Sequence, residues 1–276
     1  MHFRCGNSRF DLSRPLVMGI VNVTPDSFSD GGLHVQRDAA LAHAHKLIAE
    51  GADILDIGGE STRPGAQPVS IQQELDRVMP VIEGLKGVPV PVSIDTCKPE
   101  VMLAAIAAGA QMVNDINALQ DPAAMNAVAA GRVSVCLMHK QGDPQTMQQQ
   151  PQYQDVVTEV SAFLCERVAA AKAAGVGHDR IVIDPGFGFG KTLAHNLSLL
   201  QELKQLTELG VPILAGLSRK SMLGALTGRD TGQRLPASIA AGLIAVQRGA
   251  NILRVHDVGA TVDALKVLNA VNGAVL

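Results

Sequence analysis

The sequence predicts a (β/α)8 barrel, the TIM-barrel fold, on three observations. About eight short apolar segments, many rich in β-branched residues, alternate with stretches typical of helices; this alternation indicates parallel strands joined by crossover helices. Polar or charged residues stand at the ends of nearly all these segments. The chain has 276 residues, close to the roughly 250 typical of such a barrel, and no stretch resembles an interdomain linker. We therefore expect a single domain over 1–276.

The predicted strands can be read in order along the chain. Apolar runs lie at 17–21, 53–55, 90–94, 112–113, 133–137, 181–183 and 213–217, and the last run ends at 254. They lead into Asn22, Asp56, Asp95, Asn114-Asp115, Met138-His139-Lys140, Asp184, Ser218-Arg219-Lys220 and Arg254–His256. Because the carboxyl ends of barrel strands converge on one face, we expect these side chains to form an active site there.

Helices are expected between the strands, at roughly 36–50, 70–85, 99–108, 121–130, 153–174, 194–209, 236–249 and 260–272. Pro99 stands in the first turn of one helix, and Asp121 supplies an N-cap before a proline in another. Glycines follow six of the helices, where left-handed backbone is common. They are Gly51, Gly109, Gly131, Gly175, Gly210 and Gly249.

Two strand-to-helix loops are much longer than the two to six residues that are usual. They cover 22–35 and 58–70 and are dense in Gly, Pro, Ser, Thr and Asp, which gives flexibility and many hydrogen-bonding groups. We expect both to be mobile active-site loops that close over a charged substrate. A third long connection, 218–235, carries Arg219, Lys220, Arg229 and Arg234.

Composition excludes several classes of protein. Hydrophobic residues make up 47% of the chain and charged residues 18%, which predicts one large core and no disorder. The formal net charge of −3 gives no general attraction to nucleic acid or to an anionic membrane, so we expect neither as a partner. With no Trp and one Tyr, the core should consist mainly of Ala, Leu, Val and Ile.

The cysteines and the amino terminus predict a soluble, cytoplasmic protein. Cys5, Cys97, Cys136 and Cys165 are scattered without CxxC spacing, as is typical of reduced, buried thiols rather than disulfides or a zinc site. Residues 1–15 hold no apolar signal segment, and no run approaches the ~20 apolar residues that span a membrane.

Asp95, Asn114 and Asp184 end three different strands, where they could bind a planar heterocycle. A carboxylate accepts a pair of hydrogen bonds from an amino-pyrimidine edge much as it does from guanidinium. The alternative is that one or two of them cap helices or satisfy loop amides.

Lys220, Arg254 and His256 follow the last two strands, where barrels of this kind frequently bind phosphate. These side chains could hold an anionic leaving group. The alternative is a surface salt-bridge network, which is at least as plausible for Arg219 and the arginines after it.

Other motifs are weaker. Residues 186–192 (GFGFGKT) suggest a P-loop, but the pattern would need glycine where Pro185 stands, so we expect a flexible loop that lets Phe189 pack against substrate. His43 and His45 are two apart on a predicted helix and face different ways, which makes a poor metal pair. Asn22 precedes several oxygen-bearing residues, and one such ligand is enough for Mg²⁺ if a diphosphate is also bound.

Eight ordered motifs resemble the dihydropteroate synthase family, and the match runs from about 16 to 268. They are 22–32 (NVTPDSFSDGG), 56–65 (DIGGESTRPG), 93–96 (SIDT), 114–116 (NDI), 138–139 (MH), 184–191 (DPGFGFGK), 218–221 (SRKS) and 254–257 (RVHD). The resemblance implies condensation of 4-aminobenzoate with (7,8-dihydropterin-6-yl)methyl diphosphate to 7,8-dihydropteroate, in tetrahydrofolate biosynthesis. It also implies inhibition by sulfonamides and a homodimer built on the later helices.

The resemblance assigns roles by position. The pterin is held by Asp95, Asn114, Asp184 and Lys220, with Ile116 and Met138 packed around it. The diphosphate is bound by Asn22, Thr62, Arg254 and His256. Asn22 also binds Mg²⁺, and Asp56 orders the site. The aminobenzoate pocket comprises Phe28, Arg63, Pro64, Phe189, Lys220 and Ser221.

The implied reaction needs no protein nucleophile, because the electron-rich pterin stabilises a cation once diphosphate leaves. We therefore expect an SN1-like substitution. Its catalytic residues stabilise the developing charges and position the reactants; they are Asp95, Lys220, Arg254, His256 and Asp56. Two alternatives stay open. A pterin-dependent methyltransferase barrel would share the pterin-binding carboxylates but would not need the diphosphate-binding side chains. A non-catalytic paralogue would bind pterin without turnover.

Overall fold

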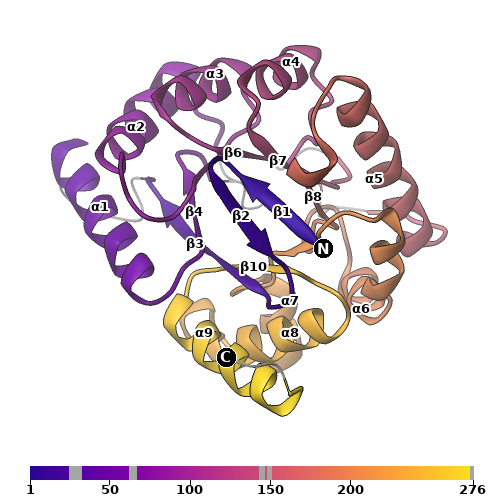
Figure 1. Ribbon diagram of the computed structural model, residues 1–276. Helices are drawn as coiled ribbons and strands as arrows, with labels where there is room; N and C mark the ends of the chain where they lie inside the picture. Colours follow the sequence, from indigo (N-terminus) through magenta and orange to yellow (C-terminus); the bar gives the residue numbers. More distant parts are fainter. Residues whose placement is uncertain (25–32, 62–66, 143–146, 148–150, 274–276) are drawn as a thin grey trace.

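The computed structural model describes residues 1–24, 33–61, 67–142, 147 and 151–273, without the side chains of 33–35. Eight of its described strands form one parallel sheet, in the order β8-β7-β6-β5-β4-β3-β10-β9. The strands are β3 (Leu16–Asn22), β4 (Ile54–Gly58), β5 (Val92–Asp95), β6 (Met112–Asp115), β7 (Ser134–Met138), β8 (Ile181–Asp184), β9 (Leu214–Ala215) and β10 (Ile252–Val255). A parallel bridge between Ile183 and Ile213 joins the two edges. The predicted (β/α)8 barrel is therefore confirmed (Figure 1).

The strands form because their apolar runs are buried on both faces. Every residue of β4, β6, β7, β8 and β9 is buried, as expected where helices cover a parallel sheet. The seventh predicted strand is shorter than the apolar run 213–217. Its chain leaves the ladder after Ala215 and turns, so that the Leu217 carbonyl accepts from the Lys220 amide at 3.3 Å.

Helices ring the barrel (Figure 1). Those described are α1 (Leu33–Ala49), α2 (Ile71–Gly84), α3 (Pro99–Ala108), α4 (Pro122–Gly131), α5 (Val156–Ala173), α6 (Leu193–Gln201), α7 (Ser221–Thr227), α8 (Leu235–Gln247) and α9 (Val258–Val271). All eight predicted helical regions contain a helix. The region 194–209 is divided, since a 3-10 helix at Leu203–Leu209 completes it. The third long connection, 218–235, contains the short helix α7, which is capped by Gly228 at φ +68°.

Two predicted helix starts are confirmed. Pro99 is the first residue of α3, and the Asp121 side chain accepts from the Ala123 amide at the start of α4. Five of the six predicted glycines have the expected positive φ, but Gly131 belongs to α4 and Arg132 takes the left-handed conformation at φ 51°. At Gly131 a Cβ would lie 2.9 Å from the Ile106 side chain, so that glycine is required by close packing.

The core follows the predicted composition. Its largest cluster lies between strands and helices and consists mainly of Val, Leu, Ile and Ala, with a few Met and one Phe. The prediction of buried thiols is wrong for Cys165, which is exposed on α5, and Cys97 is only partly buried. All four cysteines are free. Within the described chain, no helix combines the length and the apolar character needed to cross a bilayer.

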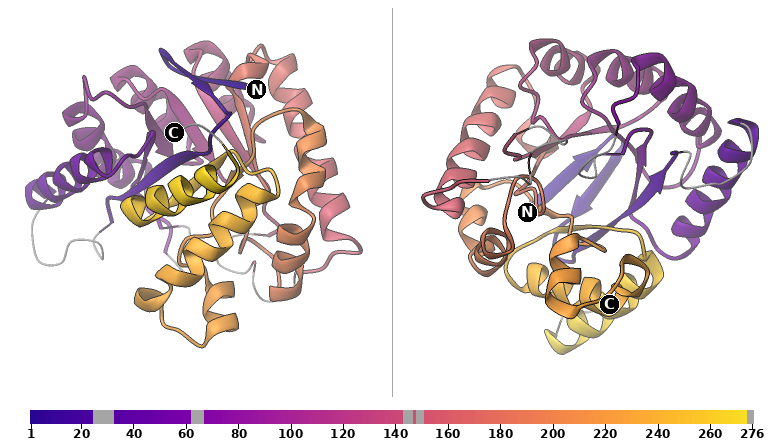
Figure 2. Two further views of the ribbon diagram at one scale, coloured as in Figure 1. Left: turned by 60° about the horizontal axis from the view of Figure 1, so that its bottom comes forward. Right: turned by 180° about the vertical axis from the view of Figure 1, so that it is seen from behind.

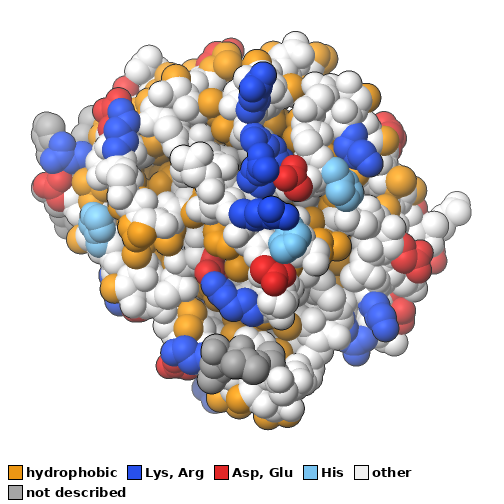
Figure 3. All heavy atoms as spheres, in the orientation of Figure 1, with side chains coloured by type: hydrophobic (Ala, Val, Ile, Leu, Met, Phe, Trp, Pro, Cys, Tyr) orange, Lys and Arg blue, Asp and Glu red, His pale blue; other side chains and the backbone are white. Residues whose placement is uncertain are grey.

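An antiparallel hairpin of β1 (His2–Cys5) and β2 (Ser8–Asp11) closes one end of the barrel. Phe3 and Cys5 are fully buried against the inward-facing first residues of several strands, among them Leu16 and Ile252. Figure 1 looks onto this end, and Figure 2 shows the hairpin and α7 at opposite ends. The outer side of the hairpin exposes Arg4 and Arg9, and Figure 3 shows basic side chains gathered over the middle of this face. The hairpin was not predicted from the sequence.

Candidate active site

Arg254 joins two carboxylates at the end of the barrel opposite the hairpin. Its Nε donates to Asp56 Oδ2 at 2.6 Å, and its Nη2 donates to Asp95 Oδ2 at 2.6 Å. Asn114 Nδ2 also donates to Asp56 Oδ2, at 2.9 Å. The strands β4, β5, β6 and β10 therefore contribute to one polar network, and the predicted convergence of these residues is confirmed.

Burial makes this network electrostatically unusual. The Asp56 side chain is fully buried, and its Oδ1 has no hydrogen-bond partner among the described residues. Such an orphaned acceptor is costly unless a ligand or water supplies a donor. Burial raises the pKa of Asp95, which Arg254 opposes and Asp56 reinforces. One guanidinium thus compensates two carboxylates, which leaves this group of charges acidic on balance.

Asp184 stands at the end of β8 with its two oxygens in different surroundings. Its Oδ1 accepts from the Gly186 amide at 2.7 Å. This oxygen therefore satisfies a loop amide, which was the alternative role considered for Asp184. Its Oδ2 faces Gly216, where a Cβ would lie 3.7 Å away. Burial raises the pKa of this carboxyl, and the Gly186 amide opposes the shift. The Oδ2 side is therefore the one that can recognise a ligand.

Lys220 lies against the loop that follows β8. Its Nζ donates to the Phe187 carbonyl at 2.6 Å and lies 4.2 Å from the centroid of the Phe189 ring. Desolvation lowers the pKa of Lys220 to about 8, with Asp184 acting in the opposite direction. A cation over an aromatic face in a buried setting is an attractive interaction, and it fixes both side chains at one side of the site.

Ile116, Met138 and Phe189 form one small apolar cluster beside these charges, as expected for residues that pack around a ring. Met147 belongs to the same cluster and Cys97 packs against it. Met147 was not predicted from the sequence, because a single methionine in a polar loop gives no periodic signal.

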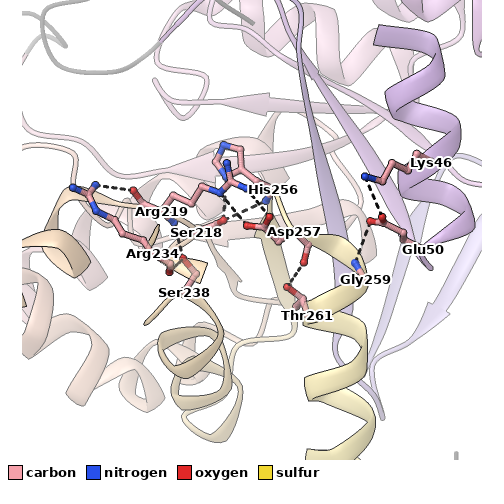
Figure 4. Close-up of polar contacts among 10 residues, drawn as sticks. All are labelled: Lys46, Glu50, Ser218, Arg219, Arg234, Ser238, His256, Asp257, Gly259 and Thr261. Atoms are coloured by element: carbon pink, nitrogen blue, oxygen red, sulfur yellow. Dashed lines mark hydrogen bonds and ion pairs between the residues drawn. The ribbon is translucent and has the colours of Figure 1, made fainter. Parts of the chain in front are cut away.

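Ser218, which directly follows the apolar run 213–217, holds the His256 side chain. Ser218 Oγ lies 3.0 Å from His256 Nδ1 and accepts from the His256 amide at 3.2 Å (Figure 4). The neighbouring Arg219 forms a bidentate ion pair with Asp257, at 3.0 and 2.5 Å. Arg219 therefore takes the salt-bridge role that was the alternative for it. Its backbone has φ 58°, and its amide donates to Ser238 Oγ.

Asn22 ends β3 and is half-buried. A Cβ at Gly58 would lie 3.9 Å from Asn22 Oδ1 and 3.7 Å from Asp95 Oδ2, so the missing side chain leaves both oxygens beside one space. No group of three His, Cys, Asp or Glu side chains suited to a metal occurs in the described part of the chain.

The other predicted site residues divide into two groups. Ser221 begins α7 beside Lys220 and is exposed. Phe28, Thr62, Arg63 and Pro64 lie outside the described residues, as do the central parts of the predicted mobile loops 22–35 and 58–70.

Comparison with known proteins identifies the family. The model of a family described as pterin binding enzyme matches residues 18–256. The dihydropteroate synthase of Neisseria meningitidis serogroup C is 52% identical over 273 residues, which cover 97% of this chain and 96% of that protein. The chain belongs to the dihydropteroate synthase family. It therefore has the activity of that family and is a transferase.

Solved structures agree. The Xanthomonas albilineans dihydropteroate synthase with 4-aminobenzoic acid is 57% identical, and the match has a TM-score of 0.93 and covers 99% of both chains. The Yersinia pestis enzyme, solved with a sulfonamide drug, is 49% identical with a TM-score of 0.94, and the match covers 99% of this chain and 100% of that one.

Proposed function

We propose that this barrel mouth joins 4-aminobenzoate to (7,8-dihydropterin-6-yl)methyl diphosphate, giving 7,8-dihydropteroate and diphosphate in tetrahydrofolate biosynthesis. The observation that carries this assignment is the buried network in which Arg254 links Asp56 and Asp95, with Asn114 donating to Asp56. It supplies carboxylates for a cationic heterocycle and a guanidinium for an anion within one site.

The pterin occupies the acidic part of the site. Its amino-pyrimidine edge donates hydrogen bonds to Asp184 Oδ2, while Asp95 and Asn114 contact the opposite side of the ring system. Ile116 and Met138 pack on its faces, as their shared apolar cluster supports. A planar donor pair meeting a buried carboxylate gives both affinity and orientation.

Bond cleavage precedes bond formation in the proposed reaction. The C–O bond between the pterin methylene and the diphosphate breaks, and its electron pair leaves with the diphosphate. The amine of 4-aminobenzoate then attacks the methylene cation and loses one proton. The carboxylates of Asp56 and Asp95 stabilise the cation, and Arg254 and His256 stabilise the departing anion. Preorganised electrostatic terms of this kind are worth several kcal/mol.

A divalent cation fits the same mouth. Asn22 Oδ1 is a hard oxygen ligand beside the open space at Gly58, and Mg²⁺ commonly takes one or two protein ligands together with phosphate oxygens and water. We propose that Asn22 holds Mg²⁺, which when bound neutralises charge on the diphosphate. Thr62 joins Arg254 and His256 in binding that group.

The aminobenzoate side of the site comprises Phe189, Lys220 and Ser221, together with the loop residues Phe28, Arg63 and Pro64. The Xanthomonas albilineans relative was solved with 4-aminobenzoic acid and the Yersinia pestis relative with a sulfonamide drug, which supports sulfonamide inhibition at this position in our chain.

We also propose a homodimer in the cytoplasm. Large apolar side chains are exposed on α7, α8 and α9, at Leu226, Leu235, Ile244, Val267 and Val271, and a second copy would cover them. Free cysteines are typical of a reducing compartment.

Diphosphate release tests the assignment. The purified chain is given the pterin diphosphate and Mg²⁺, with and without 4-aminobenzoate, and dihydropteroate is followed in parallel. We expect diphosphate and dihydropteroate to form in equal amounts, and both only when 4-aminobenzoate is present. Diphosphate release without the amine, with water capturing the methylene cation in its place, would support the proposed order in which ionisation precedes attack. No release under any condition would overturn the proposal and favour a pterin-binding protein with another activity. Asp95→Ala should reduce turnover by about 10²-fold or more with a much smaller loss of stability.

A further inference from the structure

The Lys191 side chain is buried behind the loop that follows β8, and no role has so far been assigned to it. It is 2% exposed, and its Nζ lies 2.9 Å from His139 Nδ1. The same Nζ donates to the carbonyls of Gly186 and Phe189, at 3.0 Å each. None of the ion pairs found in the described part of the chain includes Lys191. Its ammonium is therefore held mainly by backbone carbonyls and an imidazole.

The carbonyls that Lys191 binds belong to the loop 186–190, whose other side forms part of the active site. The Phe187 carbonyl accepts from Lys220, and the Phe189 ring lies under the Lys220 ammonium. The Gly186 amide donates to Asp184 Oδ1. Lys191 thus holds from behind a segment whose front positions Lys220 and Phe189.

This loop could not keep its shape by backbone preference alone. Gly186, Gly188 and Gly190 all have positive φ, between 62° and 80°, and glycine allows many other conformations. The loop also lies directly on the segment after β7: a Cβ at Gly186 would be 1.8 Å from the His139 carbonyl oxygen. We expected a flexible loop here, whereas the structure ties it at two of its carbonyls.

Burying the Lys191 ammonium costs desolvation free energy, and a side chain that only filled space would not incur this cost. Desolvation lowers the pKa of Lys191 to about 7, with Asp184 raising it and Lys220 lowering it. Desolvation and Lys191 lower the pKa of His139 to about 3, so the imidazole is neutral and Nδ1 can accept from the ammonium. Methionine would fill the same volume without desolvating a cation, but it could not donate to the loop carbonyls.

We propose that Lys191 is a positioning residue for the aminobenzoate side of the pocket, an inference that rests on the function proposed above. It clamps the loop 186–190 so that Phe189 and Lys220 keep their places. The main chain of Asp184 is also held within the sheet, where its carbonyl accepts from the His139 amide at 3.0 Å. The resemblance assigns Lys220 to both substrates and Phe189 to 4-aminobenzoate alone, whereas Asp95 and Asn114 hold the pterin from β5 and β6. Loss of Lys191 should therefore weaken binding of 4-aminobenzoate much more than binding of the pterin.

The test compares Lys191→Met with Lys172→Met, a control at an exposed lysine on α5, in the full chain. We expect Lys191→Met to raise the KM for 4-aminobenzoate about tenfold or more, since small misplacements can cost up to ~10²-fold. The pterin diphosphate should bind within about threefold of the wild-type affinity, as measured by calorimetry. A folded Lys191→Met chain with an unchanged KM would overturn the proposal, as would equal losses for both substrates.

A second pair of variants keeps the test decisive if Lys191→Met does not fold. His139→Leu removes the imidazole acceptor, and His139→Asn retains an acceptor near the position of Nδ1. We expect the KM for 4-aminobenzoate to rise in His139→Leu and to return toward the wild-type value in His139→Asn. Equal KM values for the two variants would contradict the clamp.

Amide hydrogen exchange separates this proposal from the proposed function. Exchange over 186–190 should be faster in Lys191→Met than in the wild type, and unchanged in Lys172→Met. A wild-type chain that makes no product would overturn the proposed function, and the exchange result alone would then decide whether Lys191 holds the loop.

Discussion

The two ends of the barrel differ in the kind of side chain that they bury. At the hairpin end, Phe3 and Cys5 are fully buried among apolar strand residues. At the other end, Arg254 and the two carboxylates that it binds lie largely out of solvent, and Asp56 Oδ1 has no described partner. The first end maximises apolar burial, which stabilises the fold. The second keeps polar groups partly unsatisfied, which costs stability and leaves them available to a ligand.

The largest expected effect is at the hairpin end. Phe3→Ala should lower the free energy of unfolding by about 3–5 kcal/mol, the usual cost of removing a buried phenyl ring, while turnover per folded molecule stays near the wild-type value. Urea denaturation and active-site titration would measure the two quantities. Leu103→Ala, at a side chain that is 54% exposed, is the control and should change little. A large loss of turnover in folded Phe3→Ala would break the division between the two ends.

Arginines at opposite ends give the next comparison. Arg254→Ala should reduce kcat by about 10²- to 10³-fold, the range for losing one preorganised electrostatic group. Arg14 pairs with Asp53 near the hairpin end, at 2.5 Å, but is 55% exposed. Arg14→Ala should leave kcat unchanged and alter stability by less than about 1 kcal/mol. Steady-state kinetics on both variants would check this, and similar losses of kcat would contradict it.

Binding of 4-aminobenzoate should depend on pH through the charge of Lys220. Because the pKa of Lys220 is lowered to about 8, affinity for 4-aminobenzoate should fall as pH rises through 8, by about tenfold per unit well above that value. Lys220→Met should remove this dependence.

Stability should respond in the opposite direction. Between about 8 and the ordinary value of 10.5, the folded chain holds fewer protons on Lys220 than the unfolded chain does. The free energy of unfolding contributed by this residue therefore rises with pH across that window. Denaturation of wild type and Lys220→Met at several pH values would test the sign.

Two serines offer the smallest effects. Ser218→Ala removes the hydroxyl that contacts His256, and we expect kcat/KM to fall by about 2- to 10-fold, which corresponds to one hydrogen bond. Ser134 donates to the Arg4 carbonyl at the hairpin end. Ser134→Ala should cost about 1 kcal/mol of stability with no change in kcat/KM. The opposite pattern, with only Ser134→Ala impairing activity, would show that the two ends are coupled.

Much of the barrel could be predicted, because strand-end residues such as Asp56, Asp95 and Arg254 follow apolar runs and a barrel must bring such positions together. The hairpin was missed since two alternating strands of four residues give too short a pattern. Helix α7 was missed because its seven residues lie within a polar connection. The Lys191 contacts could not be predicted, since hydrogen bonds from a side chain to loop carbonyls depend on backbone geometry that no residue pattern encodes. The roles of Phe28, Thr62, Arg63 and Pro64 stay predictions.

The hairpin also sets an order of events during synthesis. Phe3 is buried partly against Ile252 of the last strand, and β3 pairs with β10 along Leu16–Gly19. At about 5–20 residues per second, the ribosome needs roughly 10–50 s to make the chain between these strands. The Phe3 side chain therefore leaves the exit tunnel well before the β10 residues that help to bury it have been made. A nascent chain that still exposes Phe3 is a natural substrate for the chaperones that act at the ribosome.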